Sequence, residues 1–346
     1  MRETARALRP WLRFAGLLVI VAIAAAVFLD GFDLSGFLGR FAAAEPVYVA
    51  VAVVVYTVSW IPRGVRYRDI LTRTGHACGT VAMTGAVFVS QTANLIFPAR
   101  AGDGMRAYVV KKRNGVPYTT GAASLAAERV LDLAAVLALG AVGLVWTASV
   151  HGFEPTQGRG ALVAASAAAA VTVAAVIVVY FLRGEKAMSV TVRGDEDGVF
   201  ATVTDGVAGF IENLGAVFDD GEGVSRLTAT SLVIWLLDVA TAILLFYALG
   251  AASFSSAGGV FAVSLLAVSV GNLAKVVPAT PGGVGLYEAG FAAVVVAATS
   301  VGWEVAVAVA VLDHAVKNAV TVVGGIVSAL GLNVSLTSPA ETDVDG

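Results

Sequence analysis

Long apolar runs separated by short polar stretches set the pattern of this chain. Six runs are candidates for full membrane spans: 14–29, 47–61, 121–147, 161–182, 228–249 and 305–330. They are continuous in Ala, Val, Leu and Gly, whereas the strands of a membrane barrel alternate between apolar and polar residues. Backbone amides in hydrocarbon must pair within the chain, so the pattern predicts an all-α, polytopic transmembrane helical bundle.

A further apolar run, 81–97, does not fit a simple span. The sequence after it is basic up to Arg113, and basic loops stay on the cytoplasmic side of a membrane. Pro98 and Gly102 interrupt the chain at the end of this run. We therefore expect a re-entrant helical hairpin, whose irregular backbone is tolerated because it lines a cavity.

The stretch 261–300 contains a second interruption. Pro278 closes its first arm, and a glycine-rich turn precedes its second arm. The turn contains Pro281, Gly282, Gly283 and Gly285. The prediction is thus about six full spans plus two re-entrant hairpins, with eight ordinary spans as the alternative.

Charge sets the expected orientation and domain organisation. Four arginines lie between residues 2 and 13, which places the N-terminus in the cytoplasm unless 14–29 is a cleaved signal peptide. An even number of spans returns the C-terminus to the same side of the cell (plasma) membrane. We expect a single integral membrane domain over 1–346, in which 183–227 is a cytoplasmic connector and 331–346 an acidic tail.

The two interrupted segments resemble each other. In both, an asparagine precedes a Pro-Ala-x-x-Gly sequence, at 98–102 and at 278–282. The helix after each break carries ionisable residues at i, i+1 and i+4, which are Glu128, Arg129 and Asp132, then Asp313, His314 and Lys317. Since the hairpins are expected to enter from opposite sides, 47–182 and 228–330 are predicted to form an inverted repeat, as in many secondary transporters. Chance similarity in an Ala- and Gly-rich chain is the alternative.

Charged residues inside apolar spans are expensive and therefore point to function. We expect a lipid-headgroup site formed by Arg100, Asp103, Arg106, Glu128, Arg129, Asp132, Glu288, Asp313, His314 and Lys317. Arginine can hold phosphate oxygens through two hydrogen bonds, so the three arginines are the phosphate-binding candidates. The helix N-termini after Gly102 and Gly285 are expected to add partial positive charge.

Other interpretations compete with this one. The charges could pair with one another only to fix helix packing, and Arg100 and Arg106 could be juxtamembrane charges that contact anionic lipid. The carboxylates could also bind a coupling proton or sodium ion. His314 suggests proton coupling because histidine changes protonation near neutral pH, and a neutral histidine bonded within the bundle fits equally well.

Composition narrows the function classes. A single cysteine, Cys78, and three histidines far apart in sequence give neither a disulfide framework nor a metal site. The glycine-rich turn lacks the Gly-Lys-Ser/Thr ending and the preceding strand of a phosphate-binding loop, so nucleotide binding is not expected. We expect no cofactor and no nucleic-acid partner.

Several motifs resemble, in this order, the lysylphosphatidylglycerol synthase transmembrane family, a flippase-like group of bacterial and archaeal membrane proteins. They are Arg66-Tyr67, the 98–103 loop with Arg106, Glu128-Arg129 with Asp132, and the 281–285 loop with Glu288. The likeness runs from about Trp60 to Gly331. Members fused to a soluble aminoacyltransferase make and translocate aminoacylated phosphatidylglycerol, which implies that the membrane unit flips the lipid.

The resemblance implies lipid translocation without synthesis for this chain, because neither 183–226 nor the stretch after Leu330 is long enough for an acyltransferase. We expect a non-enzymatic flippase or transporter for an anionic phospholipid, a glycolipid or a polyprenyl-phosphate-linked sugar. The alternatives are a membrane-embedded lipid-linked glycosyltransferase that uses Asp103, Glu128 or Asp132, and a scaffold for a partner lipid synthase or glycosyltransferase. Membrane lipids are the expected partners, and the sequence leaves the oligomeric state open.

Overall fold

The computed structural model describes residues 34–97, 100–151, 199–276 and 280–334, and every regular element in these ranges is a helix. In chain order the elements are α2 (Leu34–Ala42), α3 (Pro46–Val58), α4 (Trp60–Arg73), α5 (Thr80–Ile96), α6 (Gly102–Asn114), α7 (Tyr118–His151), α9 (Val199–Val217), α10 (Gly221–Ala248), α11 (Ala257–Ala274), the 3-10 turn η2 (Pro281–Gly283), α12 (Leu286–Ala298) and α13 (Trp303–Leu332). The predicted spans 14–29 and 161–182 lie outside the described residues.

Six helical stretches in the described ranges are long and apolar enough to cross a membrane: Pro46–Arg73, Tyr118–Ser149, Gly221–Ala248, Ala257–Ala274, Pro281–Ala298 and Trp303–Leu332. Four of them contain or closely match predicted full spans, and the other two are the arms of the second predicted hairpin. The all-α, polytopic fold is thereby confirmed. The re-entrant character of the hairpins and the inverted repeat remain predictions.

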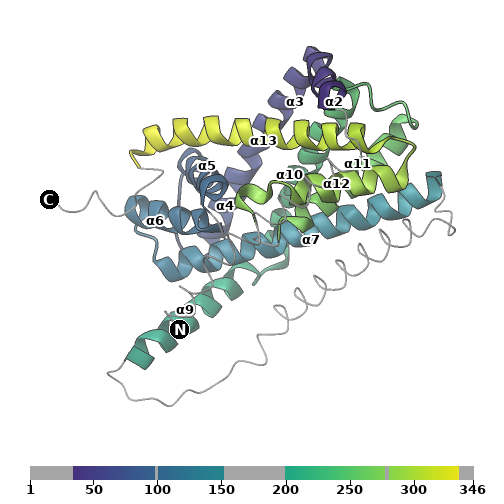
Figure 1. The fold of residues 1–346 in the computed structure, drawn as a ribbon. Helices are drawn as coiled ribbons and strands as arrows, with labels where there is room; N and C mark the ends of the chain where they lie inside the picture. The colour runs from purple at the N-terminus through teal and green to yellow at the C-terminus, as the bar shows by residue number, and fades with distance from the viewer. Residues whose placement is uncertain (1–33, 98–99, 152–198, 277–279, 335–346) are drawn as a thin grey trace.

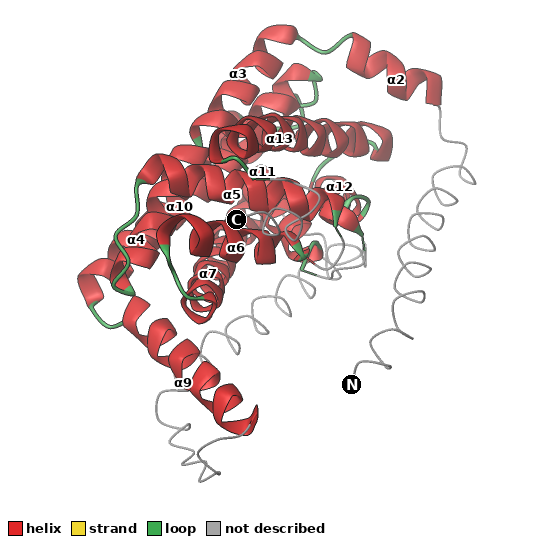
Figure 2. Cartoon of the chain, turned by 90° about the vertical axis from the view of Figure 1, so that its left-hand side faces the viewer, coloured by secondary structure: helices red, strands yellow, loops and turns green. Residues whose placement is uncertain are grey.

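The helices form an elongated bundle with two long members. Figure 1 shows α7 and α13 running along opposite sides, with α5 and α6 towards one end and α11 and α12 towards the other. Figure 2, turned by 90°, shows the same helices stacked between α7 and α13. The two interrupted segments therefore face each other inside the bundle.

Each interrupted segment is a pair of packed helices. Helix α6 contacts α5, and α12 contacts α11. Gly102 lets the helices of the first pair approach closely, because a Cβ at this position would lie 2.4 Å from the Ser90 carbonyl oxygen and 2.5 Å from the Asn94 backbone nitrogen. The turn η2 of the second pair contacts α5 of the first. The two breaks consequently meet.

The outer faces of the bundle are apolar as well. Val47, Val51 and Val54 of α3 are exposed, as are Val323 and Leu330 of α13. A helix face covered with apolar side chains is unfavourable in contact with water, whereas lipid chains provide an apolar surrounding. These faces suit the membrane interior that the apolar runs predict.

Two boundaries differ from the sequence-based expectation. The α3 span continues through Ser59 into α4, so Arg63 and Arg66 lie in the bundle rather than in a polar loop. Helix α10 begins at Gly221, before the predicted start at 228, because Asp220 caps it by accepting a hydrogen bond from the Gly223 amide at 2.6 Å. That amide, together with the Arg73 side chain, lowers the pKa of the Asp220 carboxyl below its ordinary value.

Candidate functional site

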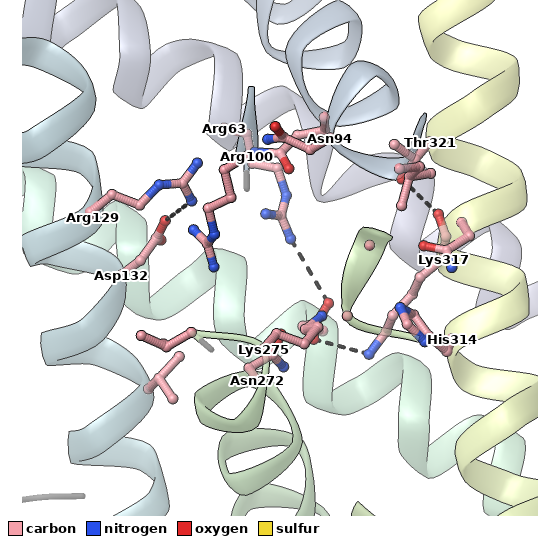
Figure 3. A pocket seen from close by; sticks show the side chains of 18 of the residues that line it. Arg63, Asn94, Arg100, Arg129, Asp132, Asn272, Lys275, His314, Lys317 and Thr321 are labelled. Carbon is pink, nitrogen blue, oxygen red and sulfur yellow. Dashed lines mark hydrogen bonds and ion pairs between the residues drawn. The ribbon is translucent and has the colours of Figure 1, made fainter. Parts of the chain in front are cut away.

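A cavity of about 440 Å³, lined by both charged and apolar side chains, lies where the two interrupted segments meet. Helices α4, α7, α10 and α13, the ends of α5 and α11, and the turn η2 contribute to its walls (Figure 3). The charged residues of the lining are Arg63, Arg100, Arg129, Lys275, Lys317, Glu128, Asp132 and Asp238. Five of these side chains are basic and three are acidic, so the lining carries excess positive charge.

A first charge cluster, made of Arg66, Arg106, Glu128 and Asp132, joins α4, α6 and α7. Arg106 Nη1 donates to Glu128 Oε2 at 2.6 Å, and Arg66 Nη1 donates to Asp132 Oδ1 at 2.7 Å. Arg66 Nη2 lies 3.6 Å from Glu128 Oε1, which connects the two pairs. Both arginine side chains are almost completely buried. Their charges are balanced by carboxylates within the protein, as burial in an apolar bundle requires.

Arg129 has different partners, although it follows Glu128 in the chain. Its Nη2 donates to Asp103 Oδ2 at 3.0 Å, and Asn94 Nδ2 donates to Asp103 Oδ1 at 2.9 Å. The distance from Arg129 Nη1 to Asp132 Oδ2 is 3.9 Å. Helix α7 thus divides its charges between the buried first cluster and the start of α6.

A second charge cluster, made of Asp238, Asp313, Lys317 and Tyr287, joins α10, α12 and α13. Lys317 Nζ lies 2.9 Å from Asp238 Oδ2 and 2.8 Å from Asp313 Oδ2. The Tyr287 hydroxyl donates to Asp313 Oδ2 at 2.5 Å. Arg63 Nη2 approaches Asp238 Oδ1 at 3.8 Å, so α4 also contacts this cluster. Lysine 317 is therefore held between two carboxylates.

His314 and Glu288 form a pair beside the second cluster. His314 Nδ1 lies 2.6 Å from Glu288 Oε1. The other oxygen of Glu288 accepts a hydrogen bond from the Gly285 amide at 2.6 Å. The chain's own carboxylate thus occupies the Gly285 amide, and the expectation that the helix N-terminus after Gly285 adds partial positive charge stays a prediction.

Two cations of the lining have no carboxylate partner among the described residues. Arg100 follows the first break, and Lys275 precedes the second. Arg100 adopts a φ of +55°, a left-handed conformation that is uncommon outside glycine and asparagine. Lys275 Nζ lies 4.6 Å from the centre of the Tyr287 ring. These two side chains supply the excess positive charge of the cavity.

Aromatic and amide side chains complete the lining. The aromatic residues are Tyr56, Trp60, Phe97 and Trp235, and the amides are Gln91, Asn94, Asn272 and Asn318. The Trp235 indole donates to Asp132 Oδ1 at 3.0 Å, whereas the buried Trp60 indole nitrogen has no hydrogen-bond partner among the described residues. The cavity can thus bind a polar group through both charges and neutral donors.

The structure brings most of the predicted headgroup residues together. Those that line the cavity are Arg100, Glu128, Arg129, Asp132, His314 and Lys317. The remaining four, Asp103, Arg106, Glu288 and Asp313, lie behind them and bind them directly. Gly282 and Gly283 of the second turn also line the cavity, whereas Pro98 and Pro278 lie outside the described residues.

Three charged lining residues were not among the predicted site residues: Arg63, Asp238 and Lys275. A signal for Asp238 was present, since it is a carboxylate inside an apolar span. Arg63 and Lys275 lie at the ends of apolar runs, where basic residues ordinarily mark the membrane boundary. Their role became visible only from the tertiary structure.

Comparisons with known proteins give the following matches. A family model described as the lysylphosphatidylglycerol synthase TM region matches residues 13–325. The chain is 44% identical over 354 residues to a Haloferax volcanii protein named Glycosyltransferase AglD, an alignment that covers 96% of this chain and 56% of that relative. It is 26% identical over 348 residues to a UPF0104 membrane protein of Methanothermobacter thermautotrophicus, with 93% of this chain and 94% of the relative covered.

Proposed function

Because the chain belongs to the lysylphosphatidylglycerol synthase transmembrane-region family, a family of multi-pass membrane proteins, we propose that it moves an anionic lipid headgroup across the bilayer. The substrate is a phospholipid, a glycolipid or a polyprenyl-phosphate-linked sugar. The name of the Haloferax relative supports a sugar-bearing lipid, although this chain spans about half of that relative's length.

One observation carries this proposal: a cavity lined by more basic than acidic side chains lies among helices that are apolar enough to span a membrane. The main barrier to lipid translocation is the desolvation of a charged headgroup in hydrocarbon. Fixed cations and amides in the cavity replace water around a phosphate and lower that barrier. The acyl chains can remain in lipid while the headgroup crosses.

A membrane-embedded glycosyltransferase is the second candidate, and the name of the Haloferax relative favours it. Such an enzyme needs a carboxylate that can act as a general base. Each carboxylate suggested for this role is engaged by an arginine: Asp103 by Arg129, Glu128 by Arg106 and Asp132 by Arg66. A carboxylate oxygen that is bound by an arginine is not free to accept a proton from a substrate hydroxyl. The geometry therefore favours transport over sugar transfer.

The test uses liposomes that contain the purified protein and a fluorescent phosphatidylglycerol or a fluorescent polyprenyl-phosphate sugar. Dithionite bleaches only the outer-leaflet probe, so bleaching beyond the level of protein-free vesicles measures translocation. Replacing a charged contact to phosphate removes about 1.5–3 kcal/mol, so Arg100→Gln should slow translocation by about tenfold or more. Arg100 has no carboxylate partner among the described residues, so this change leaves no described charge unpaired.

Lys111→Gln is the matched control, because Lys111 is exposed on α6 and lies outside the cavity lining. It should translocate lipid like the unaltered protein. Bleaching at the protein-free level with both probes would contradict the proposal. Sugar release or transfer in the same vesicles would move the enzyme ahead, and activity that appears only with an added synthase would favour a scaffold.

A further inference from the structure

We propose that Lys275 is the principal phosphate-binding residue of the cavity, and that Tyr287 and Gly283 hold its ammonium group in position for that role. The ligand class is a phosphate mono- or diester. This inference rests on the proposed function, in which the ester belongs to a lipid headgroup.

Lys275 makes no ion pair with a carboxylate in the part of the chain that the structure describes. Lys275 caps the C-terminal end of α11, is half-buried and lines the cavity. Asp238 and Asp313 are both bound by Lys317, and Arg63 also approaches Asp238, so these two carboxylates already have two cations of their own. An ammonium group that is partly removed from water and has no ion-pair partner is unfavourable, so the site is suited to a bound anion.

A contact with the Tyr287 ring fixes where this ammonium group lies. Its Nζ is 4.6 Å from the centre of the Tyr287 ring, a distance at which the ring face attracts a cation. The Tyr287 hydroxyl is in turn anchored on Asp313 at 2.5 Å. An exposed lysine would sample many rotamers, whereas this ring restricts the side chain to the cavity wall.

The glycine turn leaves room for the lysine stem. Gly283 has a φ of +74°, and a Cβ there would lie 2.3 Å from Lys275 Cγ and 2.6 Å from Cδ. The side chain thus passes directly over the Gly283 backbone. Bonds within the turn support this backbone, since Thr280 Oγ1 donates to the Val284 carbonyl at 2.8 Å and the Gly283 amide donates to the Thr280 carbonyl at 3.1 Å.

Arg100 is a second cation of the cavity lining. Like Lys275, it has no carboxylate partner among the described residues. Figure 3 shows Arg100 reaching the cavity from the first break, while Lys275 reaches it from the second. The amides Asn94 and Asn272 lie beside the two breaks. Lysine binds phosphate as a point charge and arginine as a planar fork, so the pair can hold one phosphate group from two sides.

The experiment measures binding separately from transport. Trp60 and Trp235 line the cavity, so tryptophan emission reports its occupancy in purified protein in detergent. The probes are phosphatidylglycerol, diacylglycerol as the lipid without phosphate, and soluble glycerol phosphate. The variants are Lys275→Gln, Lys275→Arg, Gly283→Ala and the control Lys111→Gln.

We expect Lys275→Gln to weaken phosphatidylglycerol binding at least tenfold and to leave diacylglycerol binding unchanged. Lys275→Arg keeps the charge and should stay within about threefold of the unaltered protein. Gly283→Ala keeps the lysine but displaces its stem, so it should weaken binding much as Lys275→Gln does. The Gly283 variant also tests the proposal should Lys275→Gln fail to fold.

The outcomes separate this inference from the proposed function. Unchanged phosphatidylglycerol affinity in folded Lys275→Gln protein, with translocation intact, overturns the phosphate role and leaves transport standing. Lysine-dependent binding without any translocation supports the phosphate site and overturns the proposed function. Glycerol phosphate that binds as tightly as the lipid supports the phosphate site and overturns a lipid as its occupant.

Discussion

The Arg106–Glu128 pair allows a quantitative test of how the first charge cluster stabilises the bundle. The Arg106 side chain is fully buried, Glu128 is 5% exposed, and their closest atoms lie 2.6 Å apart. Removing one partner of such a pair costs about 3–5 kcal/mol, because the other charge is left buried without a partner. Arg106→Met and Glu128→Met should each destabilise the protein by about this amount.

The double variant, with Arg106→Met and Glu128→Met together, tests whether the loss of stability comes from an unpaired buried charge. Replacing both members of a buried ion pair by apolar residues of similar volume is often neutral or stabilising. Arg66 keeps its bonds to Asp132 at 2.7 Å and to Ser231 at 2.9 Å when Glu128 is replaced. The double variant should therefore lie within about 1–2 kcal/mol of the unaltered protein, far from the sum of the two single changes.

The assay is equilibrium unfolding in mixed micelles with increasing denaturing detergent, read by helical circular dichroism. Arg226→Met is the matched control, since the Arg226 side chain is 64% exposed where it pairs with Asp69. An exposed pair contributes less than about 1 kcal/mol, so this variant should change little. A double variant as unstable as the sum of its singles would refute the reasoning.

Three further predictions concern packing, capping and proton coupling. Gly64→Ala should lower stability by about 1–3 kcal/mol in thermal unfolding, because its Cβ would lie 1.8 Å from Thr84 Oγ1, and Thr84→Ala should restore part of the loss. The Gly223 amide and Arg73 lower the pKa of Asp220, so the cap is fully present above about pH 4 and is lost as pH falls through the lowered value. Hydrogen-exchange protection at the start of α10 should follow that loss, and Asp220→Ala should abolish the pH dependence. His314→Gln should remove the pH dependence of translocation if the His314–Glu288 pair carries a proton, and an unchanged profile would refute coupling through this residue.

The sequence predicts the bundle and part of the site because polar groups are costly in hydrocarbon: backbone amides must pair within helices, and charged side chains in a span need a functional or structural reason. Charges in apolar spans are expensive, so Glu128, Arg129 and Asp313 stand out without any structure. Their partners do not follow from this signal. The helical spacing of Glu128 and Arg129 suggests one shared face, yet one side chain binds Arg106 and the other binds Asp103.

Residues at the ends of apolar runs are the hardest to assign. Arg63 lies after a predicted span, where a basic residue normally marks the cytoplasmic boundary. The helix continues through this point, and Arg63 instead reaches Asp238 inside the bundle. Hydropathy registers the end of an apolar run, and it carries no information on whether the helix continues into a polar interior.

Helix α4 contacts both charge clusters through neighbouring arginines. Arg63 and Arg66 are one helical turn apart, yet Arg63 reaches Asp238 in the second cluster and Arg66 holds Asp132 in the first. A rotation or axial slide of α4 must therefore stretch or shorten both ion pairs together. Arg63 lines the cavity, so an anion that draws Arg63 away from Asp238 and moves α4 also changes the distance between Arg66 and Asp132.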